Sequence, residues 1–305
     1  MSDRNRVPLS NASVRRILIA LDSSRVSEDA LSLAADIAAA TASELAGVFV
    51  EDQDLLHLAE LPFSREVQRA GAASRNLQRD RLLQDLRAQA ALAKAALVRQ
   101  ADLRRITWSF HIAQGRSEEA ILTAAGGGDI IAMTRQFGPL GQAAKVSPQI
   151  RRIVARAPAP LLVFSRTVPI RPGPTLLPFD ASEAAERMLP LAAELTRLGG
   201  GSLEVLLLNA AAASSSQHHA RLAELVGTQA AKGMRVWSPR DRATALRRLC
   251  EADRGLLLLP ADSPSLTAAH IEQILESAQA PILLQMQGVA DERRPTLETS
   301  GRSSR

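Results

Sequence analysis

Short apolar runs alternate with segments of helical periodicity along most of the chain. An apolar run of four to eight residues between polar boundaries is typical of a buried strand, and apolar residues spaced three and four apart are typical of a helix. In the first part of the chain this pattern predicts strands at 14–22, 46–50, 105–112, 129–133 and 160–164, and helices at 27–40, 116–125 and 147–156. Strands that alternate with helices indicate an α/β fold with a parallel sheet.

The second part of the chain shows the same order of elements. The pattern predicts strands at 175–180, 203–209, 234–238, 255–260 and 281–285, and helices at 183–197, 219–231, 242–252 and 267–278. We therefore expect two similar α/β units, each with a five-stranded parallel sheet that is covered by helices.

A repeat in the sequence supports this division. The segment Leu18–Ser24 recurs 158 residues later as Leu176–Ser182, and the similarity continues down the following helix. Near the end of each unit the offset falls to 121, so the second unit is 37 residues shorter. A self-match at a fixed offset predicts one duplicated structural unit. We expect domains at 14–166 and 174–287, a proline-rich linker between them, and disordered polar tails at 1–13 and 291–305.

Most of the extra length of the first unit lies at 51–101. Residues 55–61 have the pattern of a short helix, and residues 64–101 form an Ala, Leu, Arg and Gln segment that predicts one long helix. The second unit has no counterpart. The segment is a candidate contact for a protein partner or for a second copy of the chain in a homo-oligomer, and the alternative is that it covers a face or an edge of the sheet.

Composition excludes several classes of protein. No apolar run approaches the roughly 20 residues that span a bilayer, so no membrane contact is expected. The polar start lacks the apolar core of a secretory signal, and the single Cys250 excludes an intramolecular disulfide. We expect a cytoplasmic protein.

Positive charge is carried almost entirely by arginine. The formal net charge is +5, and the only lysines are Lys94, Lys145 and Lys232. Aromatic residues make up 3% of the chain, and the arginines of the long segment alternate with acidic residues. Nucleic-acid binding calls for a basic patch with aromatic stacking partners, so it is disfavoured, and an arginine-dependent surface for nucleic acid or an acidic partner stays an alternative.

Two features resemble the universal stress protein family. An aspartate, Asp22, follows the first strand, and the last strand of the first unit is preceded by Ala157–Pro160 in an Ala-Pro-Ala-Pro-Leu-Leu-Val-Phe run. Many members of that family are tandem duplications. The resemblance implies two tandem Rossmann-like domains of the adenine nucleotide α-hydrolase type, with a ligand above the carboxyl ends of the strands.

Nucleotide-binding members of this family carry the motif G-x2-G-x9-G-[ST] after the fourth strand. Glycines there let the backbone approach phosphate groups. In this chain the three glycine positions fall on Met133, on Gln136, and on Val146 or Ser147, so side chains are expected where phosphate oxygens would lie. In the second unit the corresponding stretch, 260–266, is shortened, has no glycine and contains Asp262.

The resemblance nevertheless implies a set of residues for an adenine nucleotide in the first unit. These are Asp22, Thr134, Arg135 and Ser147, with backbone atoms of Val48 at the end of the second strand. Each has a structural alternative: Val48 is an ordinary core residue, and Asp22, like its counterpart Asp180, caps nearby backbone N–H groups.

No catalytic constellation stands out. There is no G-x-S-x-G nucleophile turn, and the histidines are not grouped with carboxylates, so we expect neither an enzyme nor a metal site. The sequence predicts a non-catalytic stress-response or regulatory binding module with a degenerate nucleotide pocket and no cofactor. The alternative is a genuine ATP-binding protein that uses the first unit, with slow ATP hydrolysis.

Overall fold

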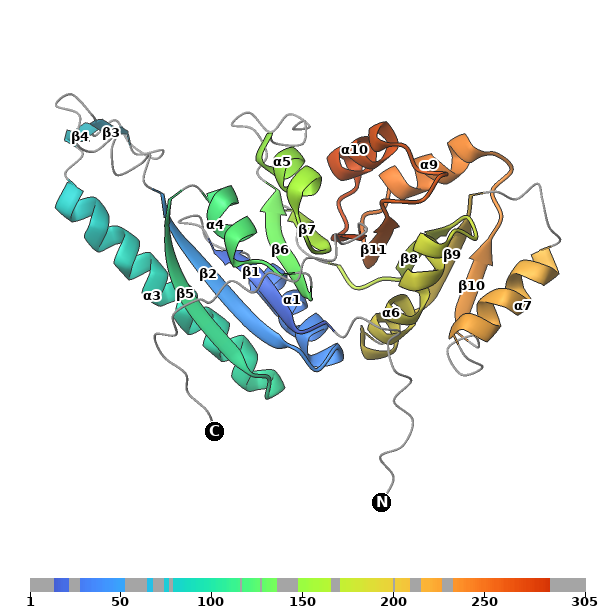
Figure 1. Ribbon diagram of the computed structural model, residues 1–305, viewed down its shortest axis with the longest axis horizontal. Coiled ribbons are helices and arrows are strands. Elements are labelled where there is room, and N and C mark those ends of the chain that lie inside the picture. Colours follow the sequence, from blue (N-terminus) through green and yellow to red (C-terminus); the bar gives the residue numbers. More distant parts are fainter. Residues whose placement is uncertain are drawn as a thin grey trace, which may run out of the picture.

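Ten strands form one continuous sheet with helices on both faces (Figure 1). This is a computed structural model. It describes residues 14–21, 28–52, 65–67, 74–76, 79–115, 117–126, 128–135, 148–165, 171–199, 201–208, 215–226 and 233–285. We refer to residues 14–165 as the first half and to residues 171–285 as the second half. Within the described residues, no helix is both long enough and apolar enough to span a bilayer.

Among its described residues, the first half contains seven strands and four helices. In chain order they are β1 (Arg16–Leu21), α1 (Glu28–Ala40), β2 (Glu44–Asp52), β3 (Arg65–Val67), β4 (Ser74–Asn76), α3 (Arg79–Arg104), β5 (Trp108–Gly115), α4 (Ser117–Ala124), β6 (Asp129–Arg135), α5 (Pro148–Arg156) and β7 (Leu161–Ser165).

The second half contains five strands and four helices among the described residues. They are β8 (Thr175–Phe179), α6 (Glu183–Gly199), β9 (Leu203–Leu207), α7 (Ser215–Val226), β10 (Met234–Trp237), α9 (Arg242–Cys250), β11 (Leu256–Pro260), α10 (Ala268–Ser277) and β12 (Ile282–Gln285).

The two halves have the same strand order. The full order is β10-β9-β8-β11-β12-β7-β6-β1-β2-β5, and all pairs within each half are parallel. Counted within its own half, each set of five strands therefore reads 3-2-1-4-5. The predicted α/β class is confirmed, with five parallel strands in each half, but the two sets of strands form one sheet and not two.

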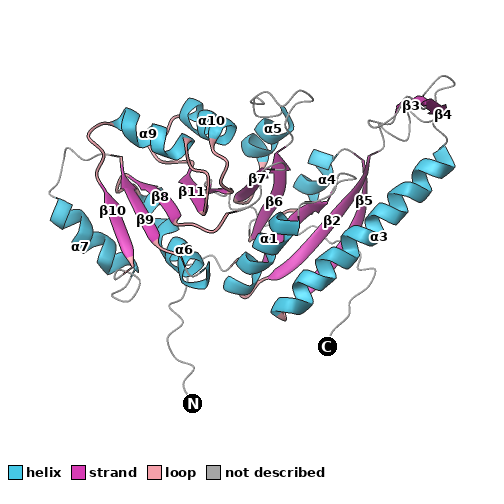
Figure 2. Ribbon diagram, turned by 180° about the vertical axis from the view of Figure 1, so that it is seen from behind, coloured by secondary structure: helices cyan, strands magenta, loops and turns pink. Residues whose placement is uncertain are grey.

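Two apolar layers hold the sheet between its helices. Helices α1, α3, α6 and α7 pack on one face, and α4, α5, α9 and α10 on the other (Figure 2). Successive residues of β1 point to opposite layers: Ile17 and Ile19 belong to the first layer, and Leu18 belongs to the second. Parallel strands are buried on both faces, which explains why the strands read as nearly continuous apolar runs in the sequence.

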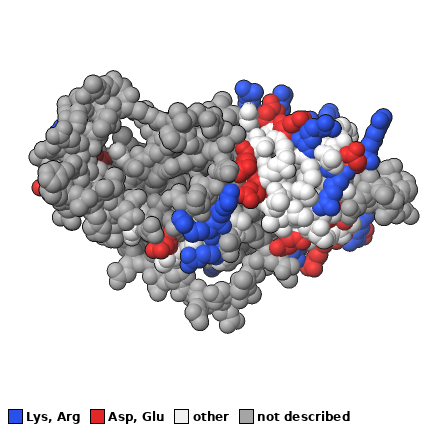
Figure 3. Space-filling model, turned by 90° about the horizontal axis from the view of Figure 1, so that it is seen from above, with Lys and Arg blue, Asp and Glu red and all other residues white. Residues whose placement is uncertain are grey.

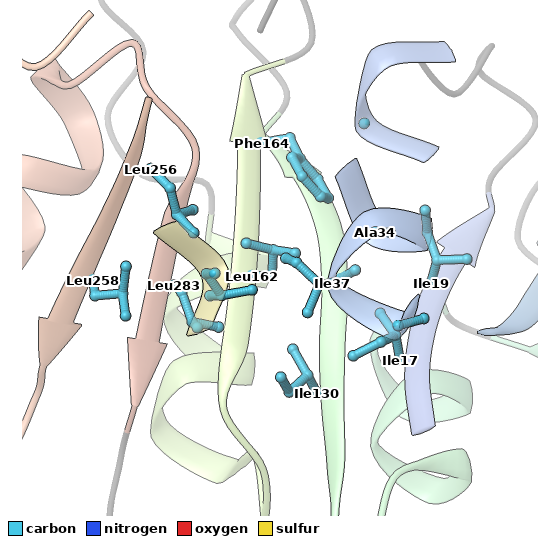
Figure 4. Close-up of a cluster of buried hydrophobic side chains, with 14 of the residues drawn as sticks. Ile17, Ile19, Ala34, Ile37, Ile130, Leu162, Phe164, Leu256, Leu258 and Leu283 are labelled. Atoms are coloured by element: carbon cyan, nitrogen blue, oxygen red, sulfur yellow. The ribbon is translucent and has the colours of Figure 1, made fainter. Parts of the chain in front are cut away.

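The halves meet at an antiparallel pair of strands, β7 and β12. Leu162 pairs with Leu283, and Val163 pairs with Ile282. Leu162 and Leu283 are counterparts at the offset of 121, so a pseudo-two-fold axis passes between them. Both side chains are fully buried, and the same core layer contains Leu258 of β11 and Ile130 of β6 (Figure 4). The two halves therefore share one core, which the sequence pattern did not predict.

Helix contacts reinforce this junction on both faces. Helix α1 packs against α6, its counterpart in the second half. On the other face Arg151 of α5 forms an ion pair with Glu272 of α10. These two residues are also counterparts at the offset of 121. In a symmetric dimer of identical chains, equivalent positions near the axis carry the same charge, so opposite charges there require two halves of different sequence.

The long helix predicted at 64–101 is corrected by the structure. Residues 65–67 and 74–76 form a two-stranded antiparallel sheet, and α3 runs from residue 79 to residue 104. Gly71, Ser74 and Asn76 have lower helix propensity than the residues of α3, which favours a break before residue 79. The short helix predicted at 55–61 lies outside the described residues.

Two helices of the first half end in Schellman motifs without glycine. In α3 the N–H of Ile106 donates to the carbonyl of Ala101, and that of Arg105 donates to Asp102. Arg105 has a φ of 54°, and Ala42 after α1 has a φ of 50° with the same pair of bonds. These left-handed residues end the helices and turn the chain into the next strand.

The ion pair beside the pseudo-two-fold axis is testable by charge reversal. Arg151→Glu is expected to lower the free energy of unfolding by about 0.5–1 kcal/mol at low salt, because a partly exposed pair is replaced by two like charges. The double variant Arg151→Glu with Glu272→Arg is expected to recover most of that loss. Urea denaturation of wild type, the two single variants Arg151→Glu and Glu272→Arg, and the double variant measures the coupling energy. If the stability losses of the two single variants simply add in the double variant, the inferred contact is contradicted.

Candidate functional site

The strand order places a potential ligand crevice in each half. In open parallel sheets, ligands bind outside the carboxyl ends of the strands, where the strand order reverses direction. That point lies between β1 and β6 in the first half and between β8 and β11 in the second. Because β7 and β12 are antiparallel, the strands of the two halves run in opposite directions at the junction, and the two crevices open in different directions.

In the second half, Asp180 stands at the crevice directly after β8. Its Oδ1 accepts a hydrogen bond from the backbone N–H of Ser182 at 3.0 Å. This local bond closes an Asx turn, in which Ala181 has a left-handed φ of 60°. Ser182 in turn accepts from the N–H of Ala185 at 3.3 Å and so caps the first turn of α6. The aspartate thus shapes the step from strand to helix.

The other carboxylate oxygen of Asp180 holds the loop that follows β11. Oδ2 accepts from the hydroxyl of Ser263 at 2.5 Å and from the N–H of Ser265 at 3.3 Å. Both serines are buried. These bonds cross the crevice from the end of β8 to the loop after β11, so the carboxylate is occupied by the protein itself.

The same loop is fixed at both ends. The N–H of Ala261 donates to the carbonyl of Gln285 at 2.8 Å, and that of Leu266 donates to Ser263 at 3.0 Å. The guanidinium of Arg242 donates to the carbonyl of Ser265. Leu266 is buried, and Thr267 then caps α10 in a reciprocal pair with His270. The stretch 260–266 is therefore an ordered loop that is held across the crevice by hydrogen bonds.

The pKa of the Asp180 carboxyl agrees with its role in holding the loop 260–266. Burial opposes ionisation of Asp180, but hydrogen bonds from Ser182, Ser263 and Ser265 outweigh it and lower the pKa of the carboxyl below its ordinary value. The carboxylate is therefore ionised at neutral pH and stabilised by donors of the protein. For Asp180, the structure favours the capping interpretation over contact with a nucleoside.

In the first half, the structure describes part of the predicted site. Thr134 and Arg135 end β6, and the β1–β6 register, which pairs Ile19 with Ala132, places Thr134 level with Leu21. Both residues thus lie at the crevice, next to where β1 ends. Asp22 and Ser147 lie outside the described residues, as do the loop positions at 136–147.

Two sequence-based placements in the first half are corrected. Val48 was expected at the end of the second strand, but β2 continues to Asp52, and Val48 pairs with Ala20 on one side and His111 on the other. Met133 was expected to project toward a phosphate, but β6 continues to Arg135, and the Met133 side chain packs in the core. In both cases the strand is longer than its apolar run.

One buried carboxylate at this edge was not identified from the sequence. Glu51, near the end of β2, is 7% exposed, and its Oε2 accepts from Nε2 of Gln114 on β5 at 3.3 Å. The sequence signal was an acidic residue directly after an apolar run. The register places Glu51 two positions beyond Phe49, the last residue of β2 that pairs with β1. It lies on the side of the crevice where β1 ends.

Other candidate chemistry is weak in the described residues. No group of three or more His, Cys, Asp or Glu side chains is placed to hold a metal ion there. Burial, together with the nearby Glu251, raises the pKa of the Cys250 thiol, so this cysteine is a protonated thiol at neutral pH.

An open groove lined by residues of α3 lies away from both crevices, on the outer side of this helix. It has a volume of about 780 Å³ and is lined mostly by apolar atoms, with Ala91, Ala95, Val98 and Leu103 among its residues. Leu92 and Leu103 of α3 are each 71% exposed. Two leucines this exposed on one helix form an apolar surface of the kind that binds partners.

Comparison with solved structures identifies the fold. A universal stress protein from Archaeoglobus fulgidus is similar over 89% of this chain and 98% of its own, with a TM-score of 0.57 and 14% identity. A putative universal stress protein from Pseudomonas aeruginosa covers 89% and 93%, with a TM-score of 0.57 and 16% identity. The resemblance to universal stress proteins is thus confirmed for the fold. The sequence matches no protein-family model and no curated protein at a significant level.

The role of Asp180 can be tested by mutation. Asp180→Ala is expected to lower the free energy of unfolding by about 1–3 kcal/mol, because the buried donors of Ser263 and Ser265 lose their acceptor. Urea denaturation measures the change. The exposed Asp102→Asn is the control, and an effect of Asp180→Ala no larger than that of the control would contradict the capping role.

The lowered pKa of Asp180 also fixes the sign of a pH effect. The ionised carboxylate stabilises the folded protein, so its contribution is present above the unfolded pKa of about 3.9 and is lost as the pH falls through the lower folded pKa. The stability difference between wild type and Asp180→Asn is therefore expected to be largest near neutral pH and to shrink below about pH 4. A difference that grows on acidification would show the opposite linkage.

Proposed function

We propose that this chain is a non-catalytic regulatory binding module of the universal stress protein type, which does not use a nucleotide. The observation that carries the proposal is the closed crevice of the second half. There Asp180 accepts hydrogen bonds from Ser263 and Ser265. The loop 260–266, which contains both serines, occupies the place of a phosphate loop.

A nucleotide would have to open this closure. Hydrogen bonds to a charged group contribute about 1.5–3 kcal/mol each, so losing two of them would cost several kcal/mol. Micromolar binding corresponds to about 8 kcal/mol, so this cost would remove a large part of the affinity. A phosphate beside the ionised Asp180 would also meet repulsion. These arguments support an inert crevice in the second half.

For the first half, the support comes from the sequence of the loop and from the sheet. The positions of the motif glycines are held by Met133, by Gln136, and by Val146 or Ser147. Glu51 adds a buried carboxylate at the same edge. ATP binding through Asp22, Thr134, Arg135 and Ser147 is the competing proposal for this half.

A regulatory module needs a contact surface, and α3 offers one. The exposed Leu92 and Leu103 and the apolar groove lie on the outer side of this helix, while its inner side, with Leu86 and Leu97, packs on the sheet. Helix α3, with 26 residues, is much longer than α7, the 12-residue helix at the equivalent place in the second half. We propose that the module contacts a protein partner or a second copy of the chain through this helix.

Calorimetric titration with ATP and Mg²⁺ tests the first part of the proposal. We expect no binding in the micromolar range, and we expect Asp22→Ala and Asp180→Ala to behave as wild type does. Micromolar binding that Asp22→Ala abolishes would establish ATP binding in the first half and overturn the proposal. Binding that only Asp180→Ala abolishes would instead locate a site in the second half.

Sedimentation at increasing protein concentration tests the α3 surface. If the surface joins two copies, wild type self-associates, and the double variant Leu92→Glu with Leu103→Glu remains a monomer because charge replaces the exposed apolar side chains. Ala243→Glu, on the exposed side of α9, is the matched control. If the double variant still self-associates, the α3 surface is not the contact between copies. If wild type is monomeric at all concentrations, the proposed contact through α3 can only be with a different protein.

A further inference from the structure

The structure gathers arginines around an exposed tryptophan at the edge of the second half. Residues 233–250 contain five arginines and one acidic residue, Asp241. Trp237 of β10, the outermost strand of its half, is 53% exposed. Lys and Arg side chains, interspersed with Asp and Glu, project from the described part of the face seen in Figure 3. The sequence alone suggested scattered arginines without aromatic partners.

Four side chains from three elements form the centre of this surface. The guanidinium of Arg248, on α9, lies 5.4 Å from the centre of the Trp237 ring. Glu204, on β9, holds Arg248 at 3.4 Å and approaches Arg235 of β10 at 3.8 Å. One carboxylate thus contacts two arginines, and one of them, Arg248, lies over the tryptophan ring. Since Arg240 and Arg247 are also exposed, the surface keeps a positive balance.

Trp237 is exposed because this edge of the sheet is thinly covered. In the first half α4 packs against both β2 and β5. In the second half the corresponding helix, α9, packs against α10, and it reaches the edge mainly through Arg248. The register makes His111 of β5 the counterpart of Trp237. A large aromatic side chain therefore stands on the second edge in a position where the first half has a half-buried histidine.

We propose that this surface, formed by Arg235, Trp237, Arg240, Arg247 and Arg248, binds single-stranded nucleic acid. An exposed aromatic ring beside arginines offers a face for base stacking, and the planar guanidinium groups match phosphate oxygens. An acidic peptide would satisfy the charges, but it would have no flat ring to place on Trp237. This inference goes beyond the proposed function and uses none of the residues on which that function rests.

The number of arginines on the surface sets the expected affinity for nucleic acid and its salt dependence. After Glu204 and Asp241 are counted, about two of the four arginines are left to neutralise phosphates, which predicts a salt dependence with a slope of about −1.4 for a single strand. Such non-specific binding falls in the range of about 10⁻⁴–10⁻⁶ M. It therefore calls for measurement at low salt.

Tryptophan fluorescence gives a direct probe, because the chain has two tryptophans. The other one, Trp108 of β5, is half-buried beside Lys94 on the opposite edge of the sheet. In the Trp108→Phe variant Trp237 is the only reporter. Titration with a 15-residue oligothymidine is expected to quench its emission saturably, with a midpoint that rises with salt. Absence of saturable quenching at low salt would overturn the proposal.

Matched variants separate stacking from charge. In anisotropy measurements with labelled oligothymidine, Trp237→Leu is expected to weaken binding about tenfold, Trp237→Phe to restore most of it, and Arg248→Ala to weaken it and reduce the salt slope. Arg197→Ala, which removes an exposed arginine of α6, is the control with the same net charge as Arg248→Ala. Urea denaturation confirms that each variant folds.

Two results would contradict the inference. Equal binding by wild type and Trp237→Leu would exclude stacking on this ring. Displacement of the oligonucleotide by a 15-residue polyglutamate at equal concentration would indicate a surface that reads charge alone, as expected for an acidic protein partner.

Discussion

The antiparallel pairing of β7 with β12 is the contact on which the rest of the structure depends. It joins two parallel sheets into one and removes an exposed edge strand from each half. Because Leu162 and Leu283 meet near a pseudo-two-fold axis, the apolar layers on both faces become continuous across the junction. The opposite charges of Arg151 and Glu272 add a contact that two identical chains could not form at equivalent positions.

The second half shows how a ligand-binding arrangement can become structural. The aspartate at the end of the first strand of that half is kept, but its acceptor oxygens serve the protein's own loop. A carboxylate placed where parallel strands diverge meets several free N–H and hydroxyl donors, and it can bind them in place of a ligand. Retention of Asp180 is therefore compatible with loss of nucleotide chemistry.

The two outer ends of the sheet, at β5 and β10, present exposed side chains of different character. The end formed by β5 is covered by α3, which presents Leu92 and Leu103 to solvent. The end formed by β10 presents Trp237 with its arginines. One end is apolar and the other is basic, so the two halves can contact different partners although they share a fold.

The sequence by itself determined the α/β class and the order of most strands and helices along the chain, because strands buried on both faces leave continuous apolar runs. It also identified Asp22 and Asp180 as equivalent residues. It could not give the β7–β12 pairing, the partners of Asp180 or the clustering around Trp237, since residues far apart in the chain meet there. The longer β2 and β6, and the left-handed ends of α1 and α3 at Ala42 and Arg105, depended on tertiary contacts and backbone hydrogen bonds that a local pattern does not contain.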